Sequence, residues 1–268
     1  MDLSSVLQVT HNARELGGVP LAGGGTLASG VLFRSDALSG LTDEGLRALR
    51  ELRIGTVIDL RTDGERARSA DVLPQDDSVK LVPLPVQGGA MDEMVQHLLP
   101  SGVGGSPSAA QVSEIVEQVP TLEDLYVAIL SSSAPQFAEL GRAVVAAAST
   151  DRPGVLFHCT AGKDRTGLAA ALLMLLAGVR REAIVDDYTL TQQNLAGGFA
   201  DALTGLITAI GVPLTPRLKT LATEAPASAI EAALDWIESE HGDASGYLRA
   251  GGMTLAEVEA LTKVLRSA

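Results

Sequence analysis

The feature that most constrains the fold is a strand-to-helix junction in the middle of the chain. The apolar segment GVLFHC is typical of a buried strand, and the segment TGLAAALLMLLAG is typical of a helix that begins near Thr166 and ends at Gly178. The loop between them, which contains AGKDR, is short, and Cys159 lies where the strand ends. A buried strand that leads almost directly into a helix is the basic unit of an α/β fold.

Other parts of the chain extend this pattern. Four segments are short and rich in β-branched residues or leucine, which favours strands: 31–33, 56–60, 80–84 and 155–158. Thr42 is a suitable N-cap for a helix that runs towards Gly55, with acidic residues in its first turn and leucines on one face. We therefore predict an α/β fold with a mostly parallel central sheet flanked by helices.

The last third of the chain is predicted to be helical from Arg181 onward. Capping-box patterns lie at 228–231 and 254–257. The Gly- and Ser-rich segment 100–110 is predicted to be a flexible loop and not a linker between two cores. A length of 268 residues permits one or two domains, and we predict a single domain, 1–268.

The composition excludes several classes of protein. A formal net charge of −13 and an aromatic content of 3% argue against a nucleic-acid partner. The longest apolar run, 168–177, is too short for a transmembrane segment. The start has no basic region followed by an apolar stretch, so we predict no secretory signal and a cytoplasmic protein by default. A single cysteine excludes an internal disulfide and a multi-cysteine metal site.

The loop after Cys159 is predicted to bind a phosphate group. A helix N-terminus presents unpaired N–H groups and a partial positive charge, which stabilise both a bound phosphate and a thiolate. The spacing between Cys159 and Arg165 lets the backbone N–H groups between them point inward around one anion. The residues expected to bind substrate in this way are Thr160, Ala161, Gly162 and Lys163.

Three side chains next to this loop add chemistry. The planar fork of Arg165 can hold two phosphate oxygens and stabilise the charge of a transferring phosphoryl group. The hydroxyl of Thr166 can donate to the sulfur, which helps the thiolate to leave when water attacks a phosphocysteine. His158 is expected to orient the loop. The combination predicts a cysteine nucleophile that hydrolyses phosphate monoesters.

Other interpretations of the cysteine segment are weaker. A lone cysteine at the end of an apolar strand is usually an inert core residue, but the neighbours of Cys159 are those of a phosphate site. A nucleotide P-loop needs a glycine five residues before Gly162 and a serine or threonine in place of Asp164. Sulfur-transfer enzymes also use a cysteine loop, but such loops usually lack the RTG ending and an arginine at this spacing.

The segment HCTAGKDRTG resembles the HCxxGxxRTG signature of protein tyrosine phosphatases and dual-specificity phosphatases at every fixed position. HNARELGG, LFRSDALSGLTDEG, VIDLRTDGE and GYLRAGGMTLAEVE resemble segments of an actinobacterial subgroup that includes mycobacterial protein tyrosine phosphatases. The resemblance implies a tyrosine phosphatase-like fold and a metal-independent enzyme without a cofactor. It also implies a helical lid over the site, expected at about residues 197–225.

The same resemblance implies roles for further residues. A general acid must protonate the leaving oxygen, and in this subgroup the aspartate before the loop arginine is a candidate, here Asp164, with Asp92 as the alternative. The loop also resembles that of phosphoinositide phosphatases, in which a lysine near the position of Lys163 meets further phosphates. By their positions alone, Arg61 in the DLR segment after a predicted strand end and Arg14 in the N-terminal segment are candidates to approach the phosphate from the side, and equally to form structural ion pairs.

The predicted substrate is phosphotyrosine in proteins, with inorganic phosphate as a product. The predicted activity extends to phosphoserine, phosphothreonine and phosphoinositide headgroups. Two alternatives stay open: a phosphate-binding pseudophosphatase, and a small-molecule phosphatase of metabolism. Export without a signal peptide, which some relatives use, also stays open.

Overall fold

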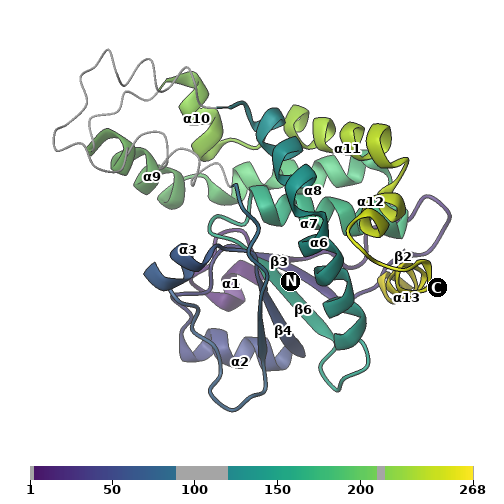
Figure 1. Cartoon of the computed structure of the whole chain (residues 1–268). Helices are drawn as coiled ribbons and strands as arrows, with labels where there is room; N and C mark the ends of the chain where they lie inside the picture. Colours follow the sequence, from purple (N-terminus) through teal and green to yellow (C-terminus); the bar gives the residue numbers. More distant parts are fainter. Residues whose placement is uncertain (1–2, 89–119, 210–214, 268) are drawn as a thin grey trace.

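A five-stranded sheet in the order β1-β3-β6-β4-β5 forms the centre of the protein (Figure 1). The computed structural model describes residues 3–88, 120–209 and 215–267. The strands are β1 (Arg14–Glu15), β3 (Leu32–Ser35), β4 (Ile54–Asp59), β5 (Lys80–Pro83) and β6 (Gly154–His158). β3, β6, β4 and β5 pair in parallel, and β1 pairs antiparallel with β3. The predicted mostly parallel sheet is confirmed, and each predicted strand is present with its ends within two residues.

Helices cover both faces of this sheet (Figure 1). One face packs against α1 (Leu3–Leu7) and α2 (Asp43–Glu51), and the other against α6 (Leu122–Ala147) and α7 (Asp164–Ala177). The side chain of Thr42 caps α2 by accepting from the N–H of Gly45, as predicted.

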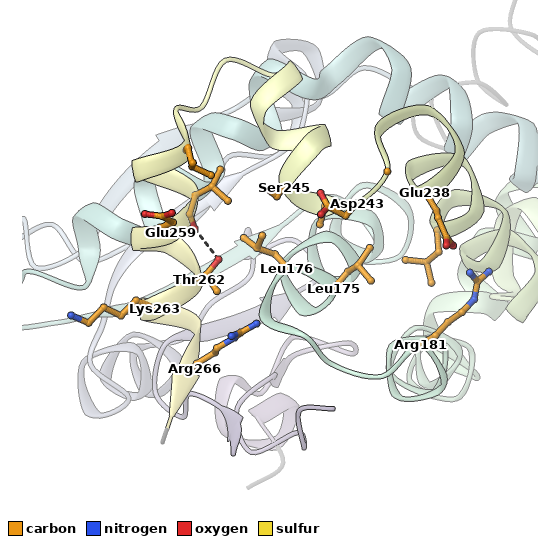
Figure 2. Close-up of a pocket in the computed structure, with 15 residues that line it drawn as sticks. Leu175, Leu176, Arg181, Glu238, Asp243, Ser245, Glu259, Thr262, Lys263 and Arg266 are labelled. Atoms are coloured by element: carbon orange, nitrogen blue, oxygen red, sulfur yellow. Dashed lines mark hydrogen bonds between the residues drawn. The ribbon is translucent and has the colours of Figure 1, made fainter. Parts of the chain in front are cut away.

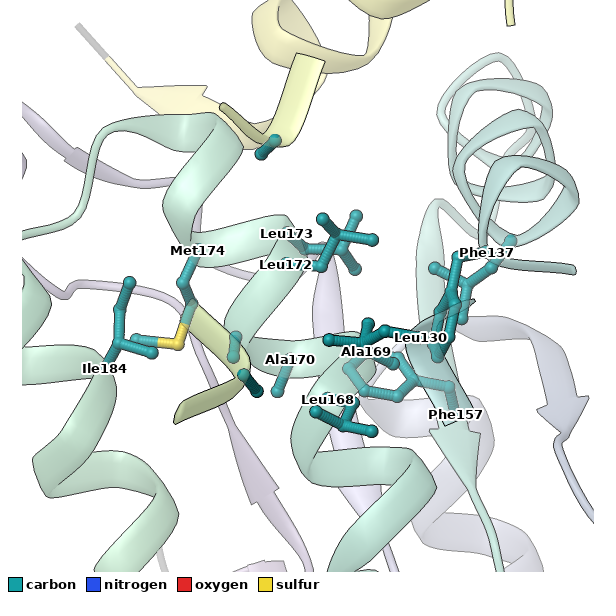
Figure 3. Close-up of a cluster of buried hydrophobic side chains, with 14 of the residues drawn as sticks. Leu130, Phe137, Phe157, Leu168, Ala169, Ala170, Leu172, Leu173, Met174 and Ile184 are labelled. Carbon is teal, nitrogen blue, oxygen red and sulfur yellow. The ribbon is translucent and has the colours of Figure 1, made fainter. Parts of the chain in front are cut away.

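The central strand β6 is buried along its whole length. Because side chains alternate along a strand, Val155 and Phe157 join the core on the α6–α7 side, whereas Leu156 joins the core on the α1–α2 side. Figure 3 shows part of the first of these cores, where Leu168 of α7 and Phe137 of α6 gather with Phe157. Burial on both faces fixes the strand that leads to Cys159.

The described residues from Arg181 onward are mostly helical. The helices are α8 (Arg181–Leu195), α9 (Gly198–Ala209), α10 (Pro216–Thr223), α11 (Ala227–His241), α12 (Ala244–Ala250) and α13 (Leu255–Leu265). The expectation of a wholly helical segment is wrong at β7 (Arg266–Ser267), which pairs antiparallel with β2 (Thr26–Leu27). Arg266 and Ser267 thus pair with the backbone of β2 instead of continuing α13.

The two predicted capping boxes have different outcomes. The box at 254–257 is confirmed, with Thr254 and Glu257 each accepting from the backbone of the other. The box at 228–231 is wrong, because α11 begins after Pro226. The hydroxyl of Ser228 instead donates to the carboxylate of Glu123 at 2.6 Å, which joins α11 to α6.

No helix in the part of the chain that the structure describes is both long and apolar enough to cross a membrane. The predicted loop at 100–110 and the alternative acid Asp92 lie outside the described residues.

Candidate active site

Three parallel strands end together beside Cys159. Ser35 of β3 and Asp59 of β4 both stand opposite His158, the last residue of β6. β6 enters the sheet between β3 and β4, and α/β proteins bind ligands at the carboxyl edge of such a crossing point. Cys159 follows β6 directly and is 2% exposed. The cysteine is therefore held at the edge of the sheet where a ligand site is expected.

The loop after the cysteine turns tightly into α7. This helix begins at Asp164, two residues before the predicted start, and stops at the predicted Gly178, its C-cap, which has the left-handed conformation. Gly162 has a φ of 65°, and a Cβ at this position would lie 2.5 Å from the carbonyl oxygen of Ser35. Both the positive φ and the close approach require glycine. The loop is thus built against the end of β3.

Arg165 is held by a carboxylate that the sequence patterns did not bring forward. Its guanidinium donates to the two oxygens of Glu65 at 2.7 and 2.8 Å, and the Thr160 hydroxyl donates to the same carboxylate at 2.5 Å. Glu65 belongs to α3 (Asp63–Arg68), where it forms a capping box with Thr62. The spacing of threonine and glutamate in TDGE was the signal that could have located this residue.

The environment of Glu65 favours its ionised form. Burial opposes ionisation, but the hydrogen bonds and charge of Arg165, with the donors of Thr160 and Thr62, hold the pKa of the Glu65 carboxyl well below its usual range. A two-pronged pair between a carboxylate and a guanidinium is strong and fixes orientation. Glu65 therefore keeps the fork of Arg165 in one position beside the loop.

Asp164, the predicted acid, is buried at the first position of α7. The hydroxyl of Tyr126 donates to its carboxylate at 2.8 Å, and Nζ of Lys163 lies 3.5 Å from the same oxygen. The hydroxyls of Tyr126 and Tyr188 are 2.7 Å apart. Burial and the charge of Asp164 raise the pKa of both phenols, so the Tyr126 hydroxyl keeps its proton and donates a hydrogen bond to Asp164.

The Lys163 side chain contacts protein groups. Its ammonium donates to the carbonyls of Leu221 at 2.5 Å and Glu224 at 3.2 Å, at the C-terminal end of α10. A cation at a helix C-terminus satisfies carbonyls that lack a partner within the helix. Lys163 therefore links the loop to α10, an arrangement that the resemblance to phosphoinositide phosphatases did not suggest.

Thr166 is fully buried. Its hydroxyl has no hydrogen-bond partner among the described residues, so the expected bond to the sulfur of Cys159 is not formed in this structure.

His158 lies in a buried network with three charged side chains. Arg61 donates to Asp59 at 2.8 and 2.9 Å and to Asp71 at 2.8 Å. Nε2 of His158 lies 3.0 Å from Asp71, and its Nδ1 lies 3.1 Å from the carbonyl oxygen of Cys159. Burial opposes the charged imidazole, but Asp71 and Asp59 raise the pKa of His158. These contacts are those of a residue that orients the loop.

The same network contains atoms that could ligate a metal. Ligand atoms of Asp59, Asp71 and His158 lie within 4.8 Å of one another. However, Arg61 donates to both carboxylates and supplies the positive charge that a metal would bring. The geometry is that of an ion-pair network.

Both arginines that were candidates for the side of the site form ion pairs. Arg61 binds Asp59 and Asp71, and Arg14 binds the carboxylate of Asp187 at 2.7 Å. Burial and the nearby charge of Arg34 lower the pKa of Arg14 to about 10. Both arginines therefore form the ion pairs of the structural alternative, and their approach to a bound phosphate stays a prediction.

A cavity of about 750 Å³ lies at the other end of α7, lined by Leu175 and Leu176 and by residues of α8, α11, α12 and α13 (Figure 2). Leu175 is eleven residues beyond Asp164, about 16 Å along the helix. Charged side chains of both signs also line the cavity, among them Glu259 and Lys263. This cavity is separate from the cysteine loop.

The chain is similar to known phosphatases over most of its length. The family profile described as "Tyrosine phosphatase family" matches residues 5–267. A tyrosine-protein phosphatase of Nostoc commune is 30% identical over 235 residues, which are 86% of this chain and 72% of the relative. The triple specificity protein phosphatase PtpB of Mycobacterium tuberculosis is 32% identical over 257 residues, covering 89% of this chain and 92% of the relative. The crystal structure of P. aeruginosa TpbA is a more distant likeness, with 19% identity, a TM-score of 0.29 and coverage of 71% of this chain and 85% of that one.

Replacing Glu65 by glutamine should destabilise the protein far more than the same change at Glu257. Both glutamates close a capping box and bind an arginine, but Glu65 and Arg165 are buried whereas Glu257 and Arg142 are partly exposed. Breaking a buried pair leaves an uncompensated charge, so we expect Glu65→Gln to lose about 3–5 kcal/mol of unfolding free energy at pH 7, measured with urea.

The pH dependence of this loss provides a second readout. The pKa of Glu65 is lower in the folded than in the unfolded protein, so its contribution is complete above about pH 5 and shrinks as the pH falls below the ordinary glutamate value of about 4.3. The difference in unfolding free energy between wild type and Glu65→Gln should therefore shrink as the pH falls. Equal losses for the two variants, or a gap independent of pH, would contradict the role given to Glu65.

Proposed function

Because the chain belongs to the tyrosine phosphatase family, we propose that it hydrolyses phosphotyrosine in proteins through a phosphocysteine formed on Cys159. One observation carries the proposal: a buried cysteine at the carboxyl end of β6 is followed by a tight loop, an arginine held in a fixed orientation and the start of α7. Such an arrangement gathers N–H donors and a guanidinium around one tetrahedral anion.

The reaction has two displacements at phosphorus. The sulfur of Cys159 attacks, the bond to the tyrosine oxygen breaks, and Asp164 gives its proton to that oxygen. Water then attacks the phosphocysteine, Asp164 takes up a proton from the water, and the bond to sulfur breaks to release inorganic phosphate. Arg165 and the loop N–H groups stabilise the charge on the phosphoryl oxygens in both steps.

We extend the proposal to phosphoserine, phosphothreonine and phosphoinositide headgroups as further substrates. The similar protein of M. tuberculosis is named a triple specificity phosphatase, which supports a scope broader than phosphotyrosine. The engagement of Lys163 with α10 favours phosphotyrosine as the first substrate to test, because a headgroup would have to compete with two carbonyls for the ammonium.

We also propose that the chain is a single domain in which α9 and α10 cover the loop as a lid. Two contacts support this: Lys163 binds the end of α10, and the ring of Phe199 in α9 lies 6.3 Å from that of His11, beside the N-terminal segment that packs on the loop. In Figure 1 both helices project from the body of the protein at the upper left.

Phosphate release from a phosphotyrosine peptide and from a small aryl phosphate, with a chelator present, tests the central assignment. Wild type should release phosphate from both, and Cys159→Ser should lose the activity by at least about 10⁴-fold, because the nucleophile is removed. Release that survived the substitution would exclude the thiol mechanism. Phosphate binding by wild type without release would favour the pseudophosphatase, and release from a small metabolite alone would favour the metabolic enzyme.

The role of Asp164 is tested by the pH dependence of kcat. A general acid must carry its proton, so the wild-type rate should fall on the basic side, and Asp164→Asn should lower kcat and abolish this basic limb. Asp92→Asn is the matched comparison and should keep the limb. If the limb disappears in Asp92→Asn and persists in Asp164→Asn, the acid is Asp92.

The lid is tested by the rate at which peroxide oxidises Cys159. Shortening the segment 198–225 should accelerate oxidation about fivefold or more, because the susceptibility of a thiolate follows its exposure. The rate in urea should be the same for both proteins and serves as the control. Equal rates in the folded proteins would show that these helices do not cover the thiol.

A further inference from the structure

We infer that Asn12 and Arg34 are positioning residues of the phosphate-binding loop, acting through the carbonyl groups of Ala161 and Gly162. The inference rests on the proposed function, since it concerns the same loop. Both residues belong to the segments HNARELGG and LFRSDALSG, which stand out in the sequence but have no part in the chemical steps described above.

The carbonyls of the loop are bound from outside. Nδ2 of Asn12 donates to the carbonyl oxygens of Gly162 at 2.8 Å and Ala161 at 3.3 Å. NH2 of Arg34 donates to the same Gly162 oxygen at 2.8 Å. Asn12 and Arg34 are both fully buried. A side-chain amide and a guanidinium therefore converge on one peptide of the loop.

A third carbonyl is held in the same manner. The N–H of Ala37, just beyond β3, donates to the carbonyl oxygen of Thr160 at 3.1 Å. Three successive carbonyls, 160–162, thus have donors in the N-terminal part of the chain. In a planar trans peptide the C=O and the N–H point in opposite directions. Binding these carbonyls on one side therefore turns the N–H groups of residues 161–163 to the other, where they can converge on an anion.

Asn12 and Arg34 are themselves fixed by two carboxylates, one buried (Asp36) and one largely buried (Asp187). NH1 of Arg34 lies 2.5 Å from Asp187 of α8, and the carboxylate of Asp36 accepts from the N–H of Asn12 at 3.0 Å. Burial opposes the charge of Asp187, but Arg34 and Arg14 hold the pKa of this carboxyl below its ordinary value. The donors therefore have little freedom to leave the loop.

The experiment compares Arg34→Gln and Asn12→Asp with Arg142→Gln. Arg142 is a matched control, since it also binds a carboxylate, that of Glu257, and a glycine carbonyl, that of Gly252, in a contact between α6 and the α13 region. Asn12→Asp keeps the shape of the side chain and its acceptor towards Arg14, but turns an acceptor towards the loop carbonyls. The measurements are kcat and KM for an aryl phosphate, the inhibition constant of inorganic phosphate, and the thermal unfolding midpoint.

We expect both loop variants to weaken inhibition by phosphate and to lower kcat/KM about ten- to hundredfold, as for the loss of charged or buried hydrogen bonds. Arg142→Gln should change neither the inhibition constant of phosphate nor kcat/KM by more than about twofold. A purely structural role would lower the unfolding midpoint but leave the phosphate inhibition constant of the folded protein unchanged, and this result would overturn the inference. If Arg34→Gln does not fold, the phosphate inhibition constant of Asn12→Asp alone tests the inference.

The same measurements separate this inference from the proposed function. Wild type that neither binds phosphate nor releases it from any substrate would refute the proposed function itself. Active wild type, with loop variants that behave like Arg142→Gln, would refute the positioning role alone. Isothermal titration of phosphate into Cys159→Ser, with and without Asn12→Asp, gives the same comparison without activity.

Discussion

A buried backbone loop that surrounds an anion with N–H groups needs hydrogen-bond partners for its carbonyls on the opposite side. This constraint organises the centre of the protein. Asn12 before β1, Arg34 within β3 and Ala37 just after β3 supply the partners. Gly162 allows the loop to approach the Ser35 carbonyl closely enough to reach them. The parallel pairing of β3 with β6 then sets the distance between the loop after β6 and the residues at the end of β3. The fold and the site share one set of contacts.

The charges around the loop are largely balanced. Arg165 is paired with Glu65, Arg34 with Asp187, and His158 lies against Asp71. A chain with a formal net charge of −13 does not draw an anion to itself through its overall field. Recognition therefore depends on fixed donors at short range, and the paired carboxylates hold those donors in position at the cost of local positive charge.

Local signals determined how much could be predicted from the sequence. The strands, the helix capped by Thr42, the box at Thr254 and the end of α7 at Gly178 depend on residues a few positions apart, and the structure contains all of them. The cap expected at Ser228 is absent because α11 begins before this residue, after Pro226, and the Ser228 hydroxyl donates to Glu123 of α6 instead. The capping-box spacing in TDGE marks Glu65 locally, but not its partner Arg165. Asn12 and Arg34 act on a loop about 130 to 150 residues away, and no local pattern reveals these contacts.

The pairing of β2 with β7 bears on how the chain folds as it is synthesised. Thr26 pairs with Ser267, and Arg266 donates to the carbonyl of Ala177 at the end of α7. The ribosome synthesises β2 and α7 long before β7. Until β7 is made, the edge of β2 has no strand to pair with, and the carbonyl of Ala177 in α7 lacks its bond from Arg266. An unpaired strand edge invites pairing with other chains. The first turn of α7 contains Asp164 and Arg165. The last turn of this helix gains the hydrogen bond from Arg266 to Ala177 only after the end of the described chain has been synthesised.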